Sequence, residues 1–219
     1  NILGHIIDNL VGLEISEIIL VTGYKGEMIE EYMARRKVER SALYDIPVRF
    51  VQQNKPRGLG EAIHLCTPFL NDEPTLIILG DTLFKAKLAQ ITKSNNSIIC
   101  IREVENPERF GVVVSDATGT ISRLVEKPTH FVSNQAIVGI YWIRESALLK
   151  ESLEEILANN VRTSGEFQLT DGLARMLEKG VTFKIAAIDE WLDCGKPETL
   201  LETNQRLLKE QTKNDASQL

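Results

Sequence analysis

The chain has 219 residues, 43% apolar and 26% charged, with a net charge of −6. This is ordinary globular composition, sufficient for one large α/β domain or two small ones, and its acidity argues against nucleic acid as a partner, which requires a positive surface. No apolar run approaches the roughly 20 residues that span a bilayer, so we expect a cytoplasmic protein with no membrane partner.

The first half of the chain alternates between helix-like and strand-like segments. Helical spacing of apolar residues predicts helices over 2–13, 26–37, 59–70 and 85–92. Runs of β-branched residues predict strands over 17–22, 48–52, 75–79 and 97–102. This alternation predicts an α/β fold with a Rossmann-like, doubly wound, mostly parallel sheet covered by helices on both faces.

The second half begins with a different pattern. Strands are predicted over 111–115, 120–126 and 135–143, with turn signals between them, which indicates a small antiparallel β insertion. Helices follow over 145–157, 166–179 and 197–209, with strands over 181–187 and 190–193. Residues 211–219 are polar, and we expect them to form a flexible tail.

Two aspartates stand at or near the ends of short apolar strands. Asp81 lies in LILGDTLF and Asp193 in WLDCG. Ligands bind outside the carboxyl ends of parallel strands, and Mg²⁺ uses one or two carboxylates together with phosphate oxygens. A helix cap for Asp81 and a turn for Asp193 are the structural alternatives, and spacing alone does not show that the two residues meet.

A lysine and several glycines mark other candidate positions. Lys127 follows Glu126 in VEKP, where Pro128 turns the chain, and a lysine there can bind a phosphate while the glutamate accepts hydrogen bonds from sugar hydroxyls. Gly58 begins a loop-to-helix junction, and Gly111 and Gly139 lie inside strands. Taken singly, each has an ordinary structural explanation as an ion pair, a helix start or a β-bulge.

The order of these segments carries more information than any one of them. HIIDNL, EIILVTGYKGEMI, QNKPRGLGEA, LILGD, RFGVV, VEKP, AIVGIYWI, GEFQLTD and WLDCG resemble successive motifs of the sugar-1-phosphate nucleotidyltransferases. The likeness is closest to the glucose-1-phosphate thymidylyltransferases and uridylyltransferases, and it covers almost the whole chain. The implied reaction joins a nucleoside triphosphate, dTTP or UTP, to a sugar 1-phosphate, releasing pyrophosphate and forming a nucleotide sugar.

The resemblance also implies roles for individual residues and for Mg²⁺ as the cofactor. It implies that Asp81 and Asp193 bind the metal and that Lys127, the third catalytic residue, binds the sugar phosphate. The implied substrate contacts are Gln53 and Gly58 on the nucleobase, Glu126 on the sugar hydroxyls, Gly111 and Gly139 along the sugar pocket, and Glu166 and Asp171 near the sugar. Homo-oligomers are common in such a family.

The sequence departs from the family pattern in three places. The opening strand and its G-G-x-G-T-R-L segment, which supply the triphosphate cradle, are absent, and the chain opens directly on a helix. We therefore expect residues 1–219 to form a single domain that lacks its first strand and nucleotide-binding loop, with the native protein beginning about one βα unit earlier. Cys194 stands where a threonine is usual, and Glu61 where the thymidylyl type has glutamine.

Two other classes of protein compete with this interpretation. A non-catalytic relative that binds a nucleotide sugar or has a regulatory role would not need the missing loop. A glycosyltransferase of similar α/β shape would also place aspartates on a metal, but it is expected to carry a D-x-D motif, and Asp81-Thr82-Leu83 is not one.

Overall fold

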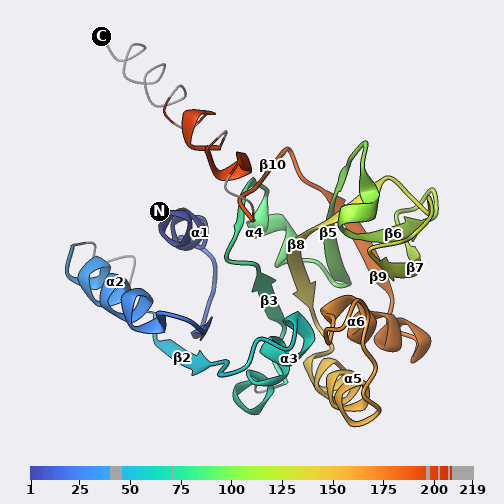
Figure 1. Ribbon diagram of the computed structural model, residues 1–219, viewed down its shortest axis with the longest axis horizontal. Helices are drawn as coiled ribbons and strands as arrows, with labels where there is room; N and C mark the ends of the chain where they lie inside the picture. Colours follow the sequence, from blue (N-terminus) through green and yellow to red (C-terminus); the bar gives the residue numbers. More distant parts are fainter. Residues whose placement is uncertain (40–45, 71, 196–197, 202, 207, 209–219) are drawn as a thin grey trace.

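The computed structural model describes residues 1–39, 46–70, 72–195, 198–201, 203–206 and 208. Its α-helices are α1 (Ile2–Asp8), α2 (Gly26–Glu39), α3 (Leu59–His64), α4 (Leu88–Ile91), α5 (Ser146–Ala158) and α6 (Leu169–Glu178). Its strands are β1 (Ile18–Thr22), β2 (Val48–Gln52), β3 (Thr75–Ile78), β4 (Thr82–Lys85), β5 (Ser97–Glu103), β6 (Gly111–Ser115), β7 (Ile121–Glu126), β8 (Gln135–Ile143), β9 (Phe183–Ala187) and β10 (Glu190–Asp193). Helix and strand alternate as expected, which confirms the α/β class (Figure 1).

The main sheet is organised around β8. This strand pairs antiparallel with β5 on one side, and with β3 and β6 on the other. Because β3 and β5 both run opposite to β8, they share one direction, and β9 lies parallel to β5. β6 and β7 form the expected antiparallel pair.

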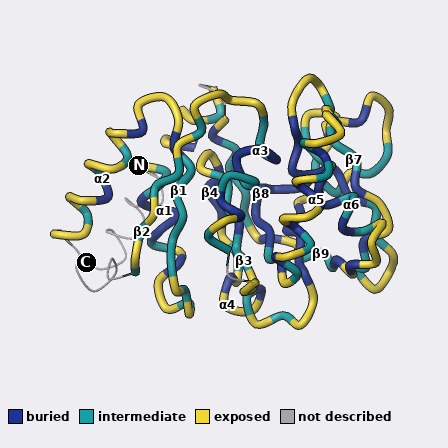
Figure 2. The backbone as a smooth tube through the Cα atoms, turned by 90° about the horizontal axis from the view of Figure 1, so that it is seen from below, coloured by how far each residue is buried: buried dark blue, intermediate teal, exposed yellow. Residues whose placement is uncertain are grey.

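β8, predicted as part of a small antiparallel insertion, does pair antiparallel but is a central strand of the main sheet. β8 lies between β3 and β5 in the centre of the sheet. Its residues are almost continuously buried, as in a strand covered on both faces, so the turn signals before it did not mark the edge of the sheet. Figure 2 shows the buried stretch of β8 running through the middle of the molecule.

A second, smaller unit is formed by α1, α2 and the parallel pair β1–β2. Figure 1 shows α1, α2 and β2 on one side of the main sheet. Ile7 and Met33 are buried between the two helices and the pair. The larger cores lie on the two faces of the main sheet, one under α5 and α6 around Leu149 and Leu173, the other under α4 around Leu88 and Cys100.

Several element boundaries differ from those expected. Residues 59–70 divide into α3 and a 3₁₀ turn (Thr67–Phe69), because a proline cannot continue the hydrogen bonding of a helix. The helix expected over 85–92 is reduced to α4, and Thr82–Lys85 forms the unforeseen strand β4, which pairs antiparallel with β10. The described residues of 198–208 are helical, whereas the tail at 211–219 lies outside the described residues. No helix among the described residues is long and apolar enough to cross a membrane.

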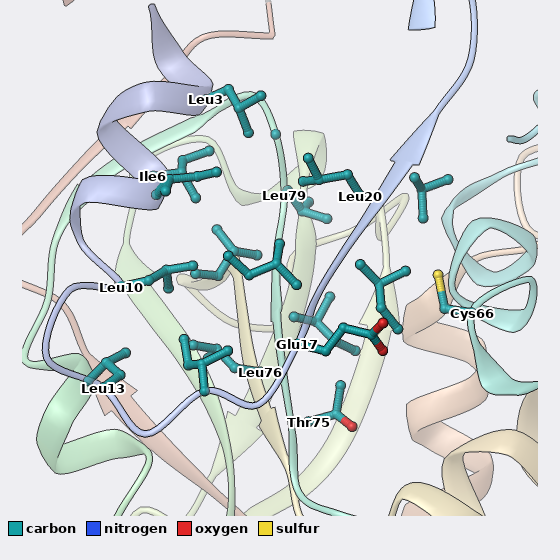
Figure 3. Close-up of a pocket in the computed structure, with 18 of the residues that line it drawn as sticks. Leu3, Ile6, Leu10, Leu13, Glu17, Leu20, Cys66, Thr75, Leu76 and Leu79 are labelled. Carbon is teal, nitrogen blue, oxygen red and sulfur yellow. The ribbon is translucent and has the colours of Figure 1, made fainter. Parts of the chain in front are cut away.

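A hollow of about 1720 Å³ separates the smaller unit from the main sheet. Figure 3 shows Leu3 and Ile6 of α1 on one side of it, and Leu20 of β1 and Leu79, just after β3, also line it. Within the described residues β1 pairs only with β2, and β3 only with β8. The apolar side chains of β1 and β3 are therefore only half-buried along most of both strands.

Candidate functional site

Asp81 and Asp193 meet although they lie far apart in the sequence. The antiparallel pairing of β10 with β4 aligns Asp193 with Thr82, and the Cys194 N–H donates to the Asp81 carbonyl at 2.8 Å. A Cβ atom added to Gly195 would lie 3.1 Å from Asp193 Oδ1 and 3.2 Å from Asp81 Oδ2. The two carboxylates therefore border the same small space.

The chemistry of this pair fits a divalent cation. Burial raises the pKa of Asp81, its backbone hydrogen bond lowers it, and the nearby Asp193 carboxylate raises it further. Two anionic oxygens that repel each other at one point are stabilised by a cation between them. Within the described part of the chain, no group of three or more acidic, histidine or cysteine side chains could hold a metal. Mg²⁺ in proteins is commonly bound by one or two carboxylates together with phosphate oxygens and water.

Gly139 supports the turn that carries Asp81. It adopts a φ of 79°, and a Cβ at this position would lie 2.8 Å from Cγ of Leu79. Its carbonyl accepts the Leu79 N–H at 2.9 Å, while the Thr82 hydroxyl donates to the Val138 carbonyl at 3.4 Å. The contacts of Gly139 therefore lie with the end of β3. Its predicted place along a sugar pocket stays a prediction.

Glu126 ends β7 in a partly buried position beside α6. The Thr170 hydroxyl donates to Glu126 Oε2 at 2.8 Å. A Cβ on Gly111 would lie 2.9 Å from the same oxygen and 3.1 Å from the Thr170 hydroxyl. Gly111 is thus a glycine because Glu126 and Thr170 pack directly against its backbone.

Lys127 follows Glu126 at the end of the strand. Its backbone adopts a φ of 40°, and its N–H donates to the Phe110 carbonyl at 3.1 Å. The side chain is half-exposed, with Nζ 3.8 Å from Glu126 Oε1. A lysine held by its backbone, with its ammonium reaching solvent beside one carboxylate, can bind a phosphate group.

The segment Arg109-Phe110-Gly111 connects the Asp81–Asp193 pair with the Glu126–Lys127 edge. Arg109 Nη2 lies 3.8 Å from Asp193 Oδ2. The Phe110 ring packs edge-on against Trp191 of β10, with the two ring centroids 4.9 Å apart. On the other side, Gly111 pairs with Glu126 in the sheet. Both parts of the candidate site are therefore fixed to one short segment of chain.

Gln53 and Gly58 lie in the loop between β2 and α3. Gln53 follows β2, where its N–H donates to the Thr22 carbonyl at 2.7 Å, and it is one of the residues that line the hollow, which also reaches Gly80. Gly58 adopts a φ of 117°, and a Cβ there would collide with the Phe167 carbonyl. Such a close approach between two backbones requires glycine.

Glu166 joins the Gln53 loop to the Glu126 edge. The Phe167 N–H donates to the Arg57 carbonyl and the Gly60 N–H to the Phe167 carbonyl, both at 2.8 Å. Glu166 therefore lies beside Gly58, and its Oε2 accepts from Gln168 Nε2 at 3.2 Å. The charges of Asp171 and Glu166 both raise the pKa of Glu126, although less than burial does.

The pKa of Glu126 gives a pH prediction. Burial raises this pKa above its ordinary value, while the Thr170 hydrogen bond and the Lys127 charge oppose the shift. A carboxyl whose pKa is higher in the folded protein contributes stability that is complete below the unfolded pKa and is lost as the pH rises through the folded pKa. Glu126→Gln, which cannot ionise, is thus expected to exceed the wild type in free energy of unfolding at pH 7.

This stability difference is measured by denaturant unfolding from pH 3.5 to 8, a range that brackets the usual carboxyl pKa of about 4.3. It should vanish at the acid end of the range. Glu105→Gln, at an exposed site, is the matched control and should show no such trend. The difference in free energy of unfolding, Glu126→Gln minus wild type, should rise from pH 4 to pH 7. A difference that falls over this range would contradict the burial argument.

Sequence reasoning missed three residues that hold the site together. Thr170 lies inside the GEFQLTD motif, but nothing in its spacing shows that it bonds to Glu126. Arg109 stands two residues before Gly111, and only the fold brings it to Asp193. Arg57 could have been found, because it lies four residues before Glu61, the spacing of a helical ion pair.

The fold is that of an α/β protein, and its paired aspartates and strand-end lysine have the chemistry to bind a divalent cation and a phosphate group. The family model described as Nucleotidyl transferase matches residues 1–210, so the chain belongs to that family.

Two curated relatives and one solved structure show how far the likeness extends. The chain is 32% identical over 207 residues to the Bifunctional protein GlmU of Methanocaldococcus jannaschii, covering 94% of this chain and 47% of that one. It is 29% identical over 224 residues to UTP–glucose-1-phosphate uridylyltransferase AglF of Haloferax volcanii, covering 96% and 85%. The crystal structure of a UDP-glucose pyrophosphorylase complexed with UDP-glucose matches with a TM-score of 0.78 and 21% identity, covering 95% and 87%, which confirms the fold. The chain thus spans about half the length of GlmU.

Proposed function

We propose that this protein transfers a nucleotidyl group from a uridine or thymidine triphosphate to glucose 1-phosphate, forming a nucleotide sugar and pyrophosphate. The observation that carries the proposal is the convergence of Asp81 and Asp193 beside Gly195. Their shared support with Lys127, through residues 109–111, adds to it, because nucleotidyl transfer needs a cation and a phosphate-binding group close together.

In this proposal the substrate supplies its own nucleophile. An oxygen of the sugar phosphate attacks the α-phosphorus of the triphosphate, the bond to pyrophosphate breaks, and no covalent enzyme intermediate forms. Asp81 and Asp193 would hold Mg²⁺, which would supply positive charge to the reacting phosphates. Lys127 holds the sugar phosphate in line for attack, so that the chain contributes orientation and charge neutralisation.

The remaining predicted contacts orient the two substrates. Glu126 accepts hydrogen bonds from sugar hydroxyls, next to the close backbone approach at Gly111. Gln53 and Gly58 contact the base, and Glu166 lies between these two regions. The name of AglF, a UTP–glucose-1-phosphate uridylyltransferase, supports a pyrimidine triphosphate and glucose 1-phosphate.

The choice of substrates is tested by measuring pyrophosphate release with UTP, dTTP, CTP and ATP, each combined with the 1-phosphates of glucose, galactose, mannose and glucosamine. The proposal predicts turnover with UTP or dTTP and glucose 1-phosphate. Pyrophosphate release with ATP alone, or rates that do not depend on a sugar phosphate, would contradict it.

We also propose that an extended, apolar strand fills the hollow between β1 and β3. Two strand edges without partners in the described residues face this space, and the residues around it are mostly apolar, with leucine and isoleucine the most frequent. Unpaired backbone groups and half-buried apolar faces lower the stability of the fold. A strand between β1 and β3 would pair the backbone groups and cover the apolar side chains. Its carboxyl end would lie near Gln53 and Gly80, where a glycine-rich loop can bind a triphosphate.

This second proposal predicts that residues 1–219 alone have little or no turnover. A longer form that carries an additional strand and glycine-rich loop before Asn1 is expected to be active and to unfold at a higher temperature. The comparison needs thermal unfolding and pyrophosphate release on both forms. Equal turnover by the two forms would contradict the need for the strand.

A further inference from the structure

The side-chain amide of Gln53 has a single possible orientation. Its Nε2 lies 3.0 Å from Glu61 Oε2 and 3.2 Å from the Gly58 carbonyl oxygen. A carboxylate and a carbonyl can only accept hydrogen bonds, so both neighbours require the NH₂ end of the amide. The Oε1 atom consequently points away from them, and no donor in the described part of the chain reaches it.

Glu61 is well suited to hold this orientation. Glu61 is only 6% exposed. Gln53 lines the hollow and Glu61 does not, so Glu61 lies behind Gln53. Its second oxygen, Oε1, accepts from Arg57 Nε at 2.6 Å, so the carboxylate is fixed from two sides. A buried carboxylate with both oxygens bonded has little freedom to move, and hydrogen bonds to a charged acceptor are strong.

We propose that Glu61 is a positioning residue for base recognition, which turns the Gln53 carbonyl oxygen toward the nucleobase and thereby selects uracil or thymine over cytosine. The inference rests on the proposed function, because it requires Gln53 to face the base. It adds a residue that does not itself touch the substrate.

The selection follows from the hydrogen-bonding edge of each base. Uracil and thymine carry an N–H donor at N3 next to carbonyl oxygens, whereas cytosine has an acceptor at N3 and an amino group beside it. In uracil and thymine, the N3–H can donate to an outward Gln53 Oε1. The Gly58 N–H, which bonds to no described residue, is available to donate to a neighbouring carbonyl of the base. Cytosine in the same position would place its N3 acceptor against the Gln53 Oε1 acceptor, and both atoms would be left without a hydrogen-bond donor.

UDP-glucose and CDP-glucose are suitable probes, because they share the sugar and the diphosphate and differ only in the base. Their dissociation constants are measured by titration calorimetry on the native full-length protein. We expect about 100-fold tighter binding of UDP-glucose in the wild type, since an unpaired buried polar group costs about that much affinity at the upper end. Glu61→Met should lower this ratio at least tenfold, because the freed amide can rotate and present Nε2.

Two further variants separate positioning from stability. Thr67→Val removes a buried hydroxyl just beyond the same helix, bonded to the His64 carbonyl, and should leave the ratio unchanged. Gln53→Leu should abolish the preference by weakening UDP-glucose alone. In the Gln53→Leu background, adding Glu61→Met should not change the ratio further, as expected if Glu61 acts only through Gln53.

The outcomes distinguish the inference from the function on which it rests. If Glu61→Met weakens both ligands equally, Glu61 is merely structural and the inference is overturned. If the wild type binds neither ligand, the proposed function fails instead. If Glu61→Met does not fold, side-chain ¹⁵N NMR of the wild type is the alternative test. The two Gln53 Nε2 protons are assigned by the loss of their signals in Gln53→Leu. Slow solvent exchange of these protons supports the inference, and fast exchange overturns it.

Discussion

Asp193→Ala is expected to lower turnover of the active protein by about 10³-fold or more, because a divalent cation that Asp81 and Asp193 would hold would stabilise charge in the transition state by several kcal/mol. Asp193 and Asp81 border one small space beside Gly195. Removing one carboxylate halves the protein's contribution to the cation site. It also removes the partner of Arg109, which lies 3.8 Å away. Turnover and Mg²⁺ dependence are measured together by pyrophosphate release.

The control for this variant is Asp189→Ala. Asp189 lies in the same part of the chain but is exposed, so its removal should leave turnover and metal dependence unchanged. Asp193→Asn keeps an oxygen that can accept the Gly195 N–H, bonded at 3.0 Å in the wild type, and should preserve the loop while losing most of the activity. Near wild-type rates for Asp193→Ala would remove Asp193 from the metal site.

Lys127→Ala is expected to lower turnover by about 10²- to 10³-fold, the usual effect of removing a group that stabilises charge in the transition state. The change should leave the fold intact, because the structural contact of Lys127 is made by its backbone N–H with the Phe110 carbonyl. The half-exposed ammonium, next to Glu126, is the part that the proposed mechanism uses. Rates at saturating and limiting sugar phosphate separate loss of binding from loss of alignment.

Two variants accompany this measurement. Lys150→Ala, on the exposed face of α5, removes the same charge at a distance from the site and should have no effect. Lys127→Arg keeps the charge but replaces a compact ammonium by a planar fork, so partial activity is expected. If Lys127→Ala retains wild-type kinetics with glucose 1-phosphate, the sugar-phosphate role of Lys127 is wrong.

Local sequence patterns predicted much of the fold. The segments that became β1, β2, β3 and β5 were placed within one or two residues, because short runs rich in β-branched and aromatic side chains favour strands. β4 was missed, since four residues of TLFK are too short to show a period. Its pairing with β10 is what brings Asp193 to Asp81, so the meeting of the two aspartates depended on a strand that was not predicted.

The candidate site was predicted in its residue types but not in its connections. The order of the motifs indicated Glu126 and Gln53, yet the hydrogen bonds that orient them come from Thr170 and Glu61. Thr170 lies 44 positions from its partner in the sequence. Such contacts depend on how α6 and α3 pack, and no local spacing encodes them.

The proposed function requires that a nucleotidyl group pass to a sugar phosphate. The decisive experiment uses the longer form that carries the additional strand, and follows UTP and, in parallel, dTTP labelled on the α-phosphorus in the presence of Mg²⁺ and glucose 1-phosphate. We expect the label of at least one of the two to move into a nucleotide sugar, unlabelled pyrophosphate to form in equal amount, and both products to require the sugar phosphate. Label recovered only as unchanged triphosphate, or as free nucleoside monophosphate, would contradict the proposed function.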